Sequence, residues 1–397
     1  MADYFERVVT DGWENVSEDA YELSSENFLG YDGPSWHISN YTLTGGKQQG
    51  VELVEIDNGC MTVLVVPTRG MGVLEAFTDE VSLGWSSPVR QVVHPSFVEA
   101  GAAGGLGWLT GFNELICRCG LSYHGAPGED VLPGVAGMQK RVTLPLHGTI
   151  ANTPAMRVAV RVQLQEPYEL SVVGEVPDTR MFGPSFSMLS TISTVPGSRE
   201  FAVQDVITNL GAMPTEMELL YHCNYGPPLL GEGARLLAAA SFVAPRDKRA
   251  QEDMATWDTY GPPEPGFAEQ CYFLRMHADD GGQTMVALAD PEEETAATIR
   301  YSVEELPAFT IWRNTAADCE GYVTGLEPGT DYPNPRLFER QKGRVIELAP
   351  EATYRTRLVF GLVDSEEEVA AVRQEIAALS EGKDCVVREA PDPDYCP

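Results

Sequence analysis

Apolar side chains at every second position are the feature that most constrains the fold of this chain. In residues 156–165, MRVAVRVQLQ, the apolar side chains alternate with arginine and glutamine. Successive side chains of a strand point to opposite faces of a sheet, so this pattern predicts a half-buried strand. A second stretch of the same kind, YELSVVGEV, follows directly after a Glu166-Pro167 turn and is the natural partner of the first.

The same alternation recurs along the chain, separated by Gly, Pro, Asn and Asp. It is found in CMTVLVVP, SFSMLSTISTV, EFAVQDVITNLG, TEMELLYHCNYG, GQTMVALAD, FTIWRN and TYRTRLVFGLV. Many short strands without intervening helices indicate stacked sheets and not βαβ units. The sequence therefore predicts an all-β protein, a large antiparallel β-sandwich with few short helices.

One helix has a clear signal, near the end of the chain. Ser365 and Glu368 form a capping box, and Gly382 closes the segment. The apolar residues between them share one helical stripe, formed by Val369, Val372, Ile376 and Leu379. By contrast, residues 100–107 are too rich in Gly and Ala for a strand and are predicted to form a flexible loop.

The chain is predicted to form one large domain. Its 397 residues are enough for two or three domains, but no low-complexity linker or internal repeat divides them. We expect an N-terminal arm, residues 1–35, packed on a single β-sandwich domain, residues 36–397, that ends in the short C-terminal helix. The oligomeric state stays open.

The net charge of −32 bears on partners and location. It opposes binding to nucleic acid or to an anionic membrane, so neither is expected as a partner. The N-terminus lacks the basic start and apolar run of a signal peptide, and no run of about 18 apolar residues occurs. We therefore expect a soluble cytoplasmic protein. Its eight cysteines are expected to be reduced thiols, because Cys117 and Cys119 have neither zinc nor redox spacing.

The stretch GYVTGLEPGTDYPNP holds one carboxylate, Glu327, immediately before a Pro-Gly turn. Its prolines and glycines exclude a helix, so a strand is expected to deliver Glu327 to the mouth of a loop and end there. A carboxylate in this place is either solvated or positioned to move a proton.

Four of the six histidines lie where a ligand could reach them. His147, between Pro145 and Gly148, is placed in a loop, and His124 in GLSYHGAP and His94 in VVHPSF are similar. His222 lies on the more polar face of a predicted strand, close to its end at Asn224. A turn histidine bound to a carbonyl, or an edge histidine bound to water, would give the same patterns.

Other chemistries lack their usual marks. Three histidines and a carboxylate could gather around a metal, but no HxH or HExxH spacing supports this. No GxSxG elbow, phosphate-binding loop or GxGxxG after a strand is present. We therefore expect neither a metal nor a cofactor.

Three segments in order, PLHGTIANTP, ELLYHCNYGPPLL and GYVTGLEPGTDYPNP, resemble the catalytic segments of the aldose 1-epimerase (galactose mutarotase-like) superfamily. Nearly the whole chain, including VVPTRGMGVLEA and GGLGWLTGFNELICRCGL, is similar to the DUF4432 branch of that superfamily. The resemblance implies a supersandwich fold with the active cleft across one sheet. It also implies roles: Glu327 as general base on the anomeric hydroxyl, His222 as general acid on the ring oxygen, and His147 as a donor that holds the sugar.

The chain also departs from the family pattern. Tyr221 replaces the usual asparagine before the second histidine, and the sugar-binding aspartate has no clear counterpart, with Asp247 and Asp258 as candidates. The remaining expected sugar contacts are polar and aromatic side chains close to predicted strand ends. They are Arg69, Asn224, Trp312, Arg313, Arg246, Asp258 and His124, with Arg118, Trp85 and Trp108 as further candidates.

These observations predict a cofactor-free carbohydrate isomerase, an enzyme that interconverts the anomers of a free, acidic or otherwise modified sugar by acid-base ring opening. Its expected partner is a small-molecule carbohydrate. Two alternatives use the same cleft. One is a carbohydrate lyase or related sugar-processing enzyme, with a metal held by His124, His147 or His222. The other is a sugar-binding protein with a degenerate site.

Overall fold

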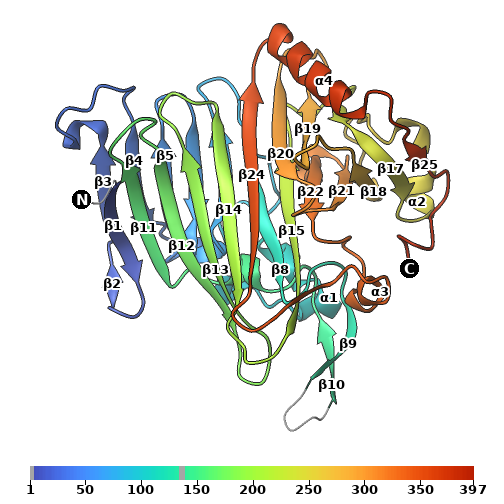
Figure 1. Cartoon of the computed structure of the whole chain (residues 1–397), viewed down its shortest axis with the longest axis horizontal. Coiled ribbons are helices and arrows are strands. Elements are labelled where there is room, and N and C mark those ends of the chain that lie inside the picture. The colour runs from blue at the N-terminus through green and yellow to red at the C-terminus, as the bar shows by residue number, and fades with distance from the viewer. Residues whose placement is uncertain (1–3, 134–138) are drawn as a thin grey trace.

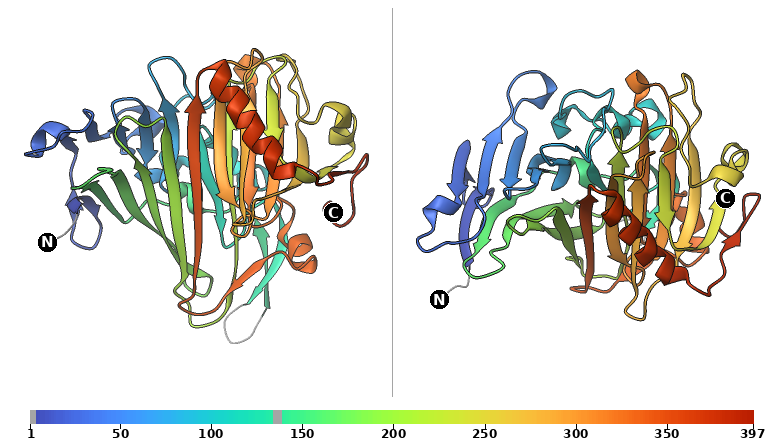
Figure 2. Two further views of the ribbon diagram at one scale, coloured as in Figure 1. Left: turned by 45° about the horizontal axis from the view of Figure 1, so that its top comes forward. Right: turned by 90° about the horizontal axis from the view of Figure 1, so that it is seen from above.

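Strands dominate the computed structural model, which describes residues 4–133 and 139–397 (Figure 1). They form two large sheets of 10 and 13 strands that lie face to face, together with a two-stranded hairpin. Figure 2 shows the two layers from other directions. Every strand pairing in the described residues is antiparallel except that of β17 with β25. The predicted antiparallel β-sandwich is confirmed.

Both large sheets combine strands from distant parts of the chain. In spatial order, the ten-stranded sheet consists of β16 (Arg235–Ala238), β19 (Gln283–Ala289), β20 (Ala296–Ser302), β24 (Thr353–Val363), β14 (Glu200–Asn209), β13 (Ser185–Thr194), β12 (Leu170–Thr179), β11 (Arg157–Gln163), β1 (Tyr4–Asp11) and β2 (Val16–Ser17). The other sheet consists, again in spatial order, of β25 (Val386–Val387), β17 (Ala240–Pro245), β18 (Gln270–Met276), β21 (Ala308–Asn314), β22 (Val323–Gly329), β15 (Thr215–Tyr225), β8 (Ile116–Leu121), β7 (Gly72–Phe77), β6 (Thr62–Val66), β5 (Glu52–Asp57), β4 (His37–Thr42) and β3 (Ala20–Ser24), and β23 (Ile346–Leu348) pairs with β15. The separate hairpin is β9 (Gly128–Pro133) with β10 (Gln139–Leu144).

The described α-helices are short. They are α1 (Ala102–Gly105), α2 (Lys248–Gln251), α3 (Arg336–Gln341) and α4 (Glu366–Ser380). The predicted C-terminal helix is α4, whose N-cap Ser365 accepts a hydrogen bond from the Glu368 amide. Val369, Val372 and Ile376 pack on the outer side of β16 and β19, so the predicted stripe is the buried one. Neither α2 nor α3 has a signal that the sequence analysis recognised.

The alternating pattern of β15 decides which side chains enter the core. Met217, Leu219, Tyr221 and Cys223 belong to the buried cluster shared by the two sheets. His222 lies on the opposite, outer face of the same strand, where it contacts the aromatic rings that cover this sheet. One strand therefore contributes to the core with one face and to a surface pocket with the other.

An ion pair crosses the core between the sheets. Arg118 on β8 binds Asp205 on β14 through two hydrogen bonds of 2.5 and 3.0 Å, and neither side chain is exposed. The Tyr221 hydroxyl donates a third hydrogen bond to Asp205, at 2.5 Å. Arg118 and Tyr221 therefore serve the join between the sheets, and their side chains point away from the outer face of β15.

The N-terminal residues are part of both sheets. Strand β1 pairs with β11 at the edge of one sheet, and β3 pairs with β4 at the edge of the other. Residues 1–3 lie outside the described part, and the division of the chain at residue 35 stays a prediction.

Residues 100–107 do not form a strand, as predicted. They contain α1, in which Ala103 and Gly104 have positive φ angles of 50° and 72°. All eight cysteines are free thiols. None of the helices in the described ranges is long and apolar enough to cross a membrane.

Candidate functional site

A pocket of about 350 Å³ opens on the outer face of the 13-stranded sheet. Its floor is formed by strands β15, β18, β21 and β22. Its walls are formed by the loops that precede β8, β9 and β11 and by the segments that follow β17 and β22. Apolar and aromatic side chains make up most of the lining, as in many small-molecule sites. The lining residues are Leu106, Trp108, Leu109, Phe112, Ala126, Pro127, Leu146, His147, His222, Arg246, Glu269, Cys271, Trp312, Glu327 and Pro333.

Glu327 and His222 meet at the floor because their strands are neighbours. The register of β15 with β22 pairs Cys223 with Leu326 and Leu220 with Gly329, which places His222 directly opposite Glu327. Directly opposite side chains of an antiparallel pair lie on the same face. Nε2 of His222 is 3.1 Å from Oε1 of Glu327. The structure therefore brings these two side chains together on the outer face of the sheet.

A glycine leaves room for this contact. Gly325 is on the same face of β22 as Glu327. A Cβ atom at this position would lie 2.5 Å from Oε1 of Glu327 and 3.1 Å from Cε1 of His222. Any larger residue would therefore displace the carboxyl group or the ring.

Asn224 fixes the tautomer of His222. The Asn224 amide nitrogen donates to the carbonyls of Glu114 and His222, at 3.0 and 3.1 Å, which directs its oxygen toward the ring. Nδ1 of His222 is 2.6 Å from that oxygen, so Nδ1 carries the hydrogen. In the neutral ring, Nε2 is then an unprotonated base that faces Glu327.

His147 completes the cluster from the pocket wall. Its ring is 5.4 Å from that of His222 and 4.7 Å from that of Trp108, between ring centroids. Its backbone has a positive φ of 57°, which is uncommon for a residue other than glycine. Gly148 follows with a φ of 73°, and a Cβ there would lie 2.4 Å from the Gly120 carbonyl oxygen. The loop therefore approaches β8 closely and holds His147 in a strained conformation.

Burial shifts the three titratable groups in a consistent direction. Burial raises the pKa of Glu327 well above its ordinary value, the negative charge of Glu269 raises it further, and Arg246 opposes the shift. Burial lowers the pKa of His222 to about 4, against the opposing effect of Asn224. Burial lowers the pKa of His147 well below its usual range, and the neighbouring His222 and His124 lower it further.

Burial therefore favours a state in which the Glu327–His222 pair holds one proton. The proton rests on Glu327, because burial favours the neutral form of both groups. Its transfer to Nε2 of His222 would give a carboxylate beside an imidazolium. The pair can thus present one acid and one base at the same time, which is what coupled proton transfer requires.

Several predicted sugar contacts lie at or near the pocket. Trp312 lines it and donates from Nε1 to Glu269, at 2.7 Å. Arg246 also lines it, pairs with Glu269 at 3.2 Å and donates to the Cys271 sulfur at 3.0 Å. Asn224 lies behind His222 and contacts the ring.

Other predicted contacts lie away from the pocket lining. Arg69 is buried against Glu114 and backbone carbonyls. Arg313 donates to the carbonyls of Thr256 and Trp257, and Asp258 lies near Arg235 at the edge of the other sheet. His124 is buried against Asp331. Asp247, the other candidate for the sugar-binding aspartate, is the N-cap of α2.

The sequence analysis missed several pocket residues, among them Glu269, Cys271 and Phe112. Glu269 precedes β18 and resembles a solvated acid at a strand end, and Cys271 resembles a core thiol. Phe112 lies in an irregular segment without periodicity, and its ring is 5.0 Å from that of His222. Nothing in the described residues groups three or more His, Cys, Asp or Glu side chains in a way that could hold a metal ion.

Comparisons with known proteins agree with this architecture. Residues 48–362 match the family described as a domain of unknown function, DUF4432. The crystal structure of a candidate aldose 1-epimerase from Klebsiella pneumoniae is 34% identical in sequence, with a TM-score of 0.91 over 98% of this chain and 99% of that one. No curated protein matches the chain.

More distant structures share the fold. A galactose mutarotase-like protein from Clostridium acetobutylicum is 13% identical, with a TM-score of 0.55 over 88% of this chain and all of that one. A candidate aldose 1-epimerase from Escherichia coli K12 is also 13% identical, with a TM-score of 0.51 over 79% of this chain and all of that one. The chain therefore has a galactose mutarotase-like fold.

Proposed function

The chain belongs to the DUF4432 family, and from its pocket we propose that it is an aldose 1-epimerase-like isomerase that interconverts the anomers of a sugar. The observation that carries the proposal is the contact between Glu327 and His222. Two groups that share one proton face a pocket of about 350 Å³, with His147 beside them. Ring opening of a cyclic hemiacetal needs one proton removed and one delivered, without a cofactor or a covalent intermediate.

In the proposed mechanism, the proton of the pair first moves from Glu327 to Nε2 of His222. The Glu327 carboxylate then takes the proton of the anomeric hydroxyl while His222 donates to the ring oxygen, and the C1–O5 bond breaks. The open aldehyde turns about its C1–C2 bond, and the reverse transfers close the ring as the other anomer. His147 is the donor that holds the sugar, and the apolar walls exclude water.

The charges at the rim favour an uncharged sugar. Arg246 is the cationic residue of the described pocket lining, and it is already paired with Glu269 and Asp247. A carboxylate or phosphate on the sugar would have to displace these acids, or would lie beside them. We therefore propose a neutral aldose in place of the acidic sugar that the sequence analysis left open.

The position of Tyr221 gives no support to a degenerate site that only binds sugar. Its side chain enters the core and binds Asp205 through its hydroxyl, so its replacement of asparagine does not alter the pocket floor.

Solution measurements separate the three candidate functions. A binding protein would show sugar binding by calorimetry with anomer exchange at the rate of the buffer. A lyase would convert the sugar into an unsaturated product, which absorbs in the ultraviolet, and removal of metal would abolish that activity. The proposed isomerase would leave the sugar chemically unchanged and would keep its activity after treatment with a chelator.

The pH profile of kcat/KM should show the one-proton pair. Below the His222 pKa of about 4, His222 takes up a second proton and the pair has no base, so kcat/KM should fall as the pH decreases through this value. At higher pH the rate should fall again, when Glu327 loses the shared proton at its raised pKa. Polarimetry or NMR across this range, corrected for the buffer reaction, checks the prediction. An acid limb near 6.5, the value of an ordinary imidazole, would contradict it.

A further inference from the structure

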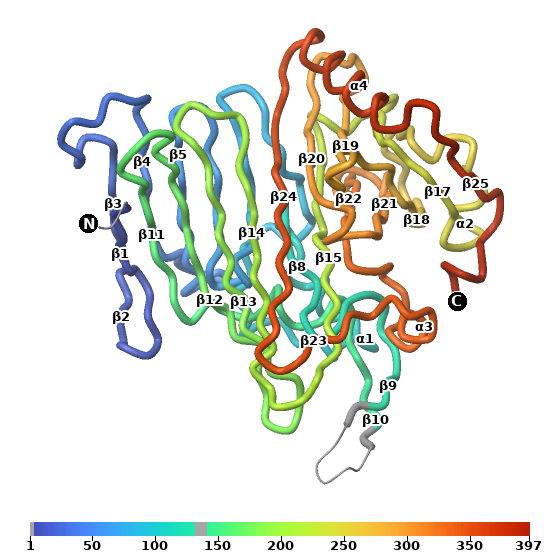
Figure 3. The backbone as a smooth tube through the Cα atoms, viewed as in Figure 1, coloured from blue at the N-terminus to red at the C-terminus, as the bar shows by residue number. Residues whose placement is uncertain are grey.

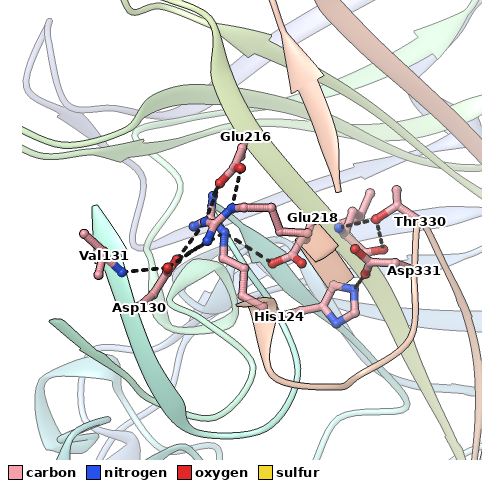
Figure 4. Close-up of polar contacts among 10 residues, drawn as sticks. His124, Asp130, Val131, Glu216, Glu218, Thr330 and Asp331 are labelled. Atoms are coloured by element: carbon pink, nitrogen blue, oxygen red, sulfur yellow. Dashed lines mark hydrogen bonds and ion pairs between the residues drawn. The ribbon is translucent and has the colours of Figure 1, made fainter. Parts of the chain in front are cut away.

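Two acidic side chains, Glu218 and Asp331, lie on the same segments as His222 and Glu327. Glu218 on β15 is four residues before His222, and Asp331 is four residues after Glu327. The register that places His222 opposite Glu327 also places Glu218 opposite Asp331. Thr330 continues the pairing beyond β22, because its amide donates to the Leu219 carbonyl at 2.8 Å. Both acids are 1% exposed. Figure 4 shows Glu218 and Asp331 with His124 beside them.

The hydrogen bonds from the nearby arginines to carboxylates all go to acids other than Glu218 and Asp331. Arg340 forms two hydrogen bonds to Asp130, of 2.8 and 2.9 Å, and two to Glu216, of 2.6 and 2.7 Å. Arg336 also binds Glu216, and Arg344 binds Glu339 at 2.5 and 2.8 Å. Glu218 has only the Nε atom of Arg336, 4.0 Å away, as a cationic partner in the described part of the chain.

Glu218 and Asp331 therefore share a proton. They lie opposite each other and both are buried, and two neighbouring buried carboxyl groups cannot both ionise without a cation for each. Burial raises the pKa of both carboxyl groups well above the ordinary range. The charge of Asp331 raises the pKa of Glu218 further, and the charge of Glu339 raises the pKa of Asp331 further. The titratable and charged groups near them in the described part of the chain are Tyr123, His124, Arg336, Glu339, Arg344 and Tyr354.

This cluster lies directly behind the pocket wall. Nε2 of His124 contacts Oδ1 of Asp331. The loop of His124 is hydrogen-bonded on both sides: the Ala126 amide donates to the Pro333 carbonyl at 3.2 Å, and the His147 amide donates to the Gly125 carbonyl at 3.0 Å. Ala126, Pro333 and His147 all line the pocket. Figure 3 shows α3, which follows Pro335, beside the β9–β10 hairpin.

We propose that Glu218, Asp331 and His124 form a proton-sharing clamp that positions the pocket wall and holds His147 in its strained conformation. The contact between His124 and Asp331 joins two loops, and the backbone bonds of Gly125 and Ala126 pass this constraint to His147 and Pro333. None of the three touches the reacting atoms, so they are positioning residues. That the wall holds a sugar rests on the proposed function, but the clamp itself can be tested without a sugar.

The direction of the pH dependence follows from the shared proton. In the unfolded chain the carboxyl groups lose their protons near pH 4, whereas the folded protein keeps one between Glu218 and Asp331 to a higher pH. The contribution of the clamp is therefore complete at low pH and is lost as the pH rises through the raised pKa. When the proton leaves to water, two adjacent carboxylates repel each other and the loops separate.

Hydrogen exchange of the Ala126 and His147 amides tests the clamp in the protein without ligand. Above the raised pKa, their protection in the wild type should fall by about tenfold per pH unit beyond the change in the intrinsic exchange rate. Glu218→Gln keeps the shape of the neutral acid and removes the titration. It should keep the neutral-pH protection of both amides and abolish the alkaline loss, and Asp331→Asn should do the same.

Two further variants separate positioning from general stability. Glu218→Ala should lose protection of both amides already at neutral pH, so that rescue by glutamine identifies the hydrogen bond. Glu347→Gln, an exposed acid on β23, should keep the wild-type pH dependence. Wild-type protection that follows the intrinsic rate at every pH would overturn the proposal. So would a Glu218→Gln variant with the same alkaline loss as the wild type. These results do not depend on anomer exchange, so they fail or hold separately from the proposed function.

Discussion

Glu327→Gln should lower the turnover of anomer exchange by about 100- to 10,000-fold, the usual loss when general-base catalysis is removed. Glutamine keeps the size of the side chain and much of its hydrogen bonding, but it can neither accept the hydroxyl proton nor share one with His222. The fold should be preserved, because a neutral amide replaces a buried carboxyl group that already favours its neutral form. Sugar affinity, measured by calorimetry, should change little.

His222→Asn should lower turnover as severely as Glu327→Gln. The double variant should be hardly worse than either single one, because acid and base act in one proton-transfer event. Glu347→Gln is the matched control and should retain wild-type turnover. Near-normal turnover in folded Glu327→Gln would remove this glutamate from the mechanism. Losses that simply multiply in the double variant would show that the two residues act independently.

The second large effect concerns stability. Arg118→Met should lower the free energy of unfolding by about 3–5 kcal/mol, because it leaves the buried Asp205 carboxylate without its cation. The same substitution also removes the hydrogen bonds from Arg118 to the Met71 carbonyl and to Ser190, both 2.7 Å long. Urea unfolding of wild type and variant measures the difference.

Arg141→Met provides the comparison for this loss. Arg141 forms an exposed ion pair with Glu129, with side chains 75% and 62% exposed, and its loss should cost at most about 1 kcal/mol. A loss below about 1 kcal/mol in Arg118→Met would show that the pair contributes little to joining the sheets. If the variant does not fold at all, Asp205→Asn is the second test: it leaves the buried Arg118 guanidinium without its anion and should also cost about 3–5 kcal/mol.

Alternation along the strands made much of the fold predictable, together with the face of its strand on which His222 lies. The alternation on β15 places His222 on the more polar face of the strand. The structure agrees, because the side chains of the opposite face, including Tyr221, lie in the core. The strand that carries Glu327 was predicted from its flanking prolines and glycines, and it is β22. The contact of the two residues also needed the pairing of β15 with β22, which came only from the family resemblance and the structure.

The remaining site could not be predicted, because the environment of a charged side chain is set by distant segments. Arg69 and Arg246 both resemble charges near strand ends in the sequence, yet one is buried against Glu114 and the other lines the pocket. His124 and His147 lie in similar loop-like stretches of the sequence. In the structure, however, His124 is buried against Asp331, which comes from a distant segment of the chain, and it does not line the pocket. A helix such as α3, six residues long, is stabilised mainly by its tertiary contacts and has little local signal.

The most direct test of the central claim, that the Glu327–His222 pair catalyses anomer exchange, is NMR saturation transfer between the two anomers. Wild-type protein and Glu327→Gln should be compared on a broad panel of neutral aldoses, uronic acids and sugar phosphates. We predict transfer above the buffer rate with at least one neutral aldose for the wild type, and transfer at the buffer rate for the variant that still binds this sugar. Wild-type transfer at the buffer rate for every sugar, including those that calorimetry shows to bind, would contradict the claim.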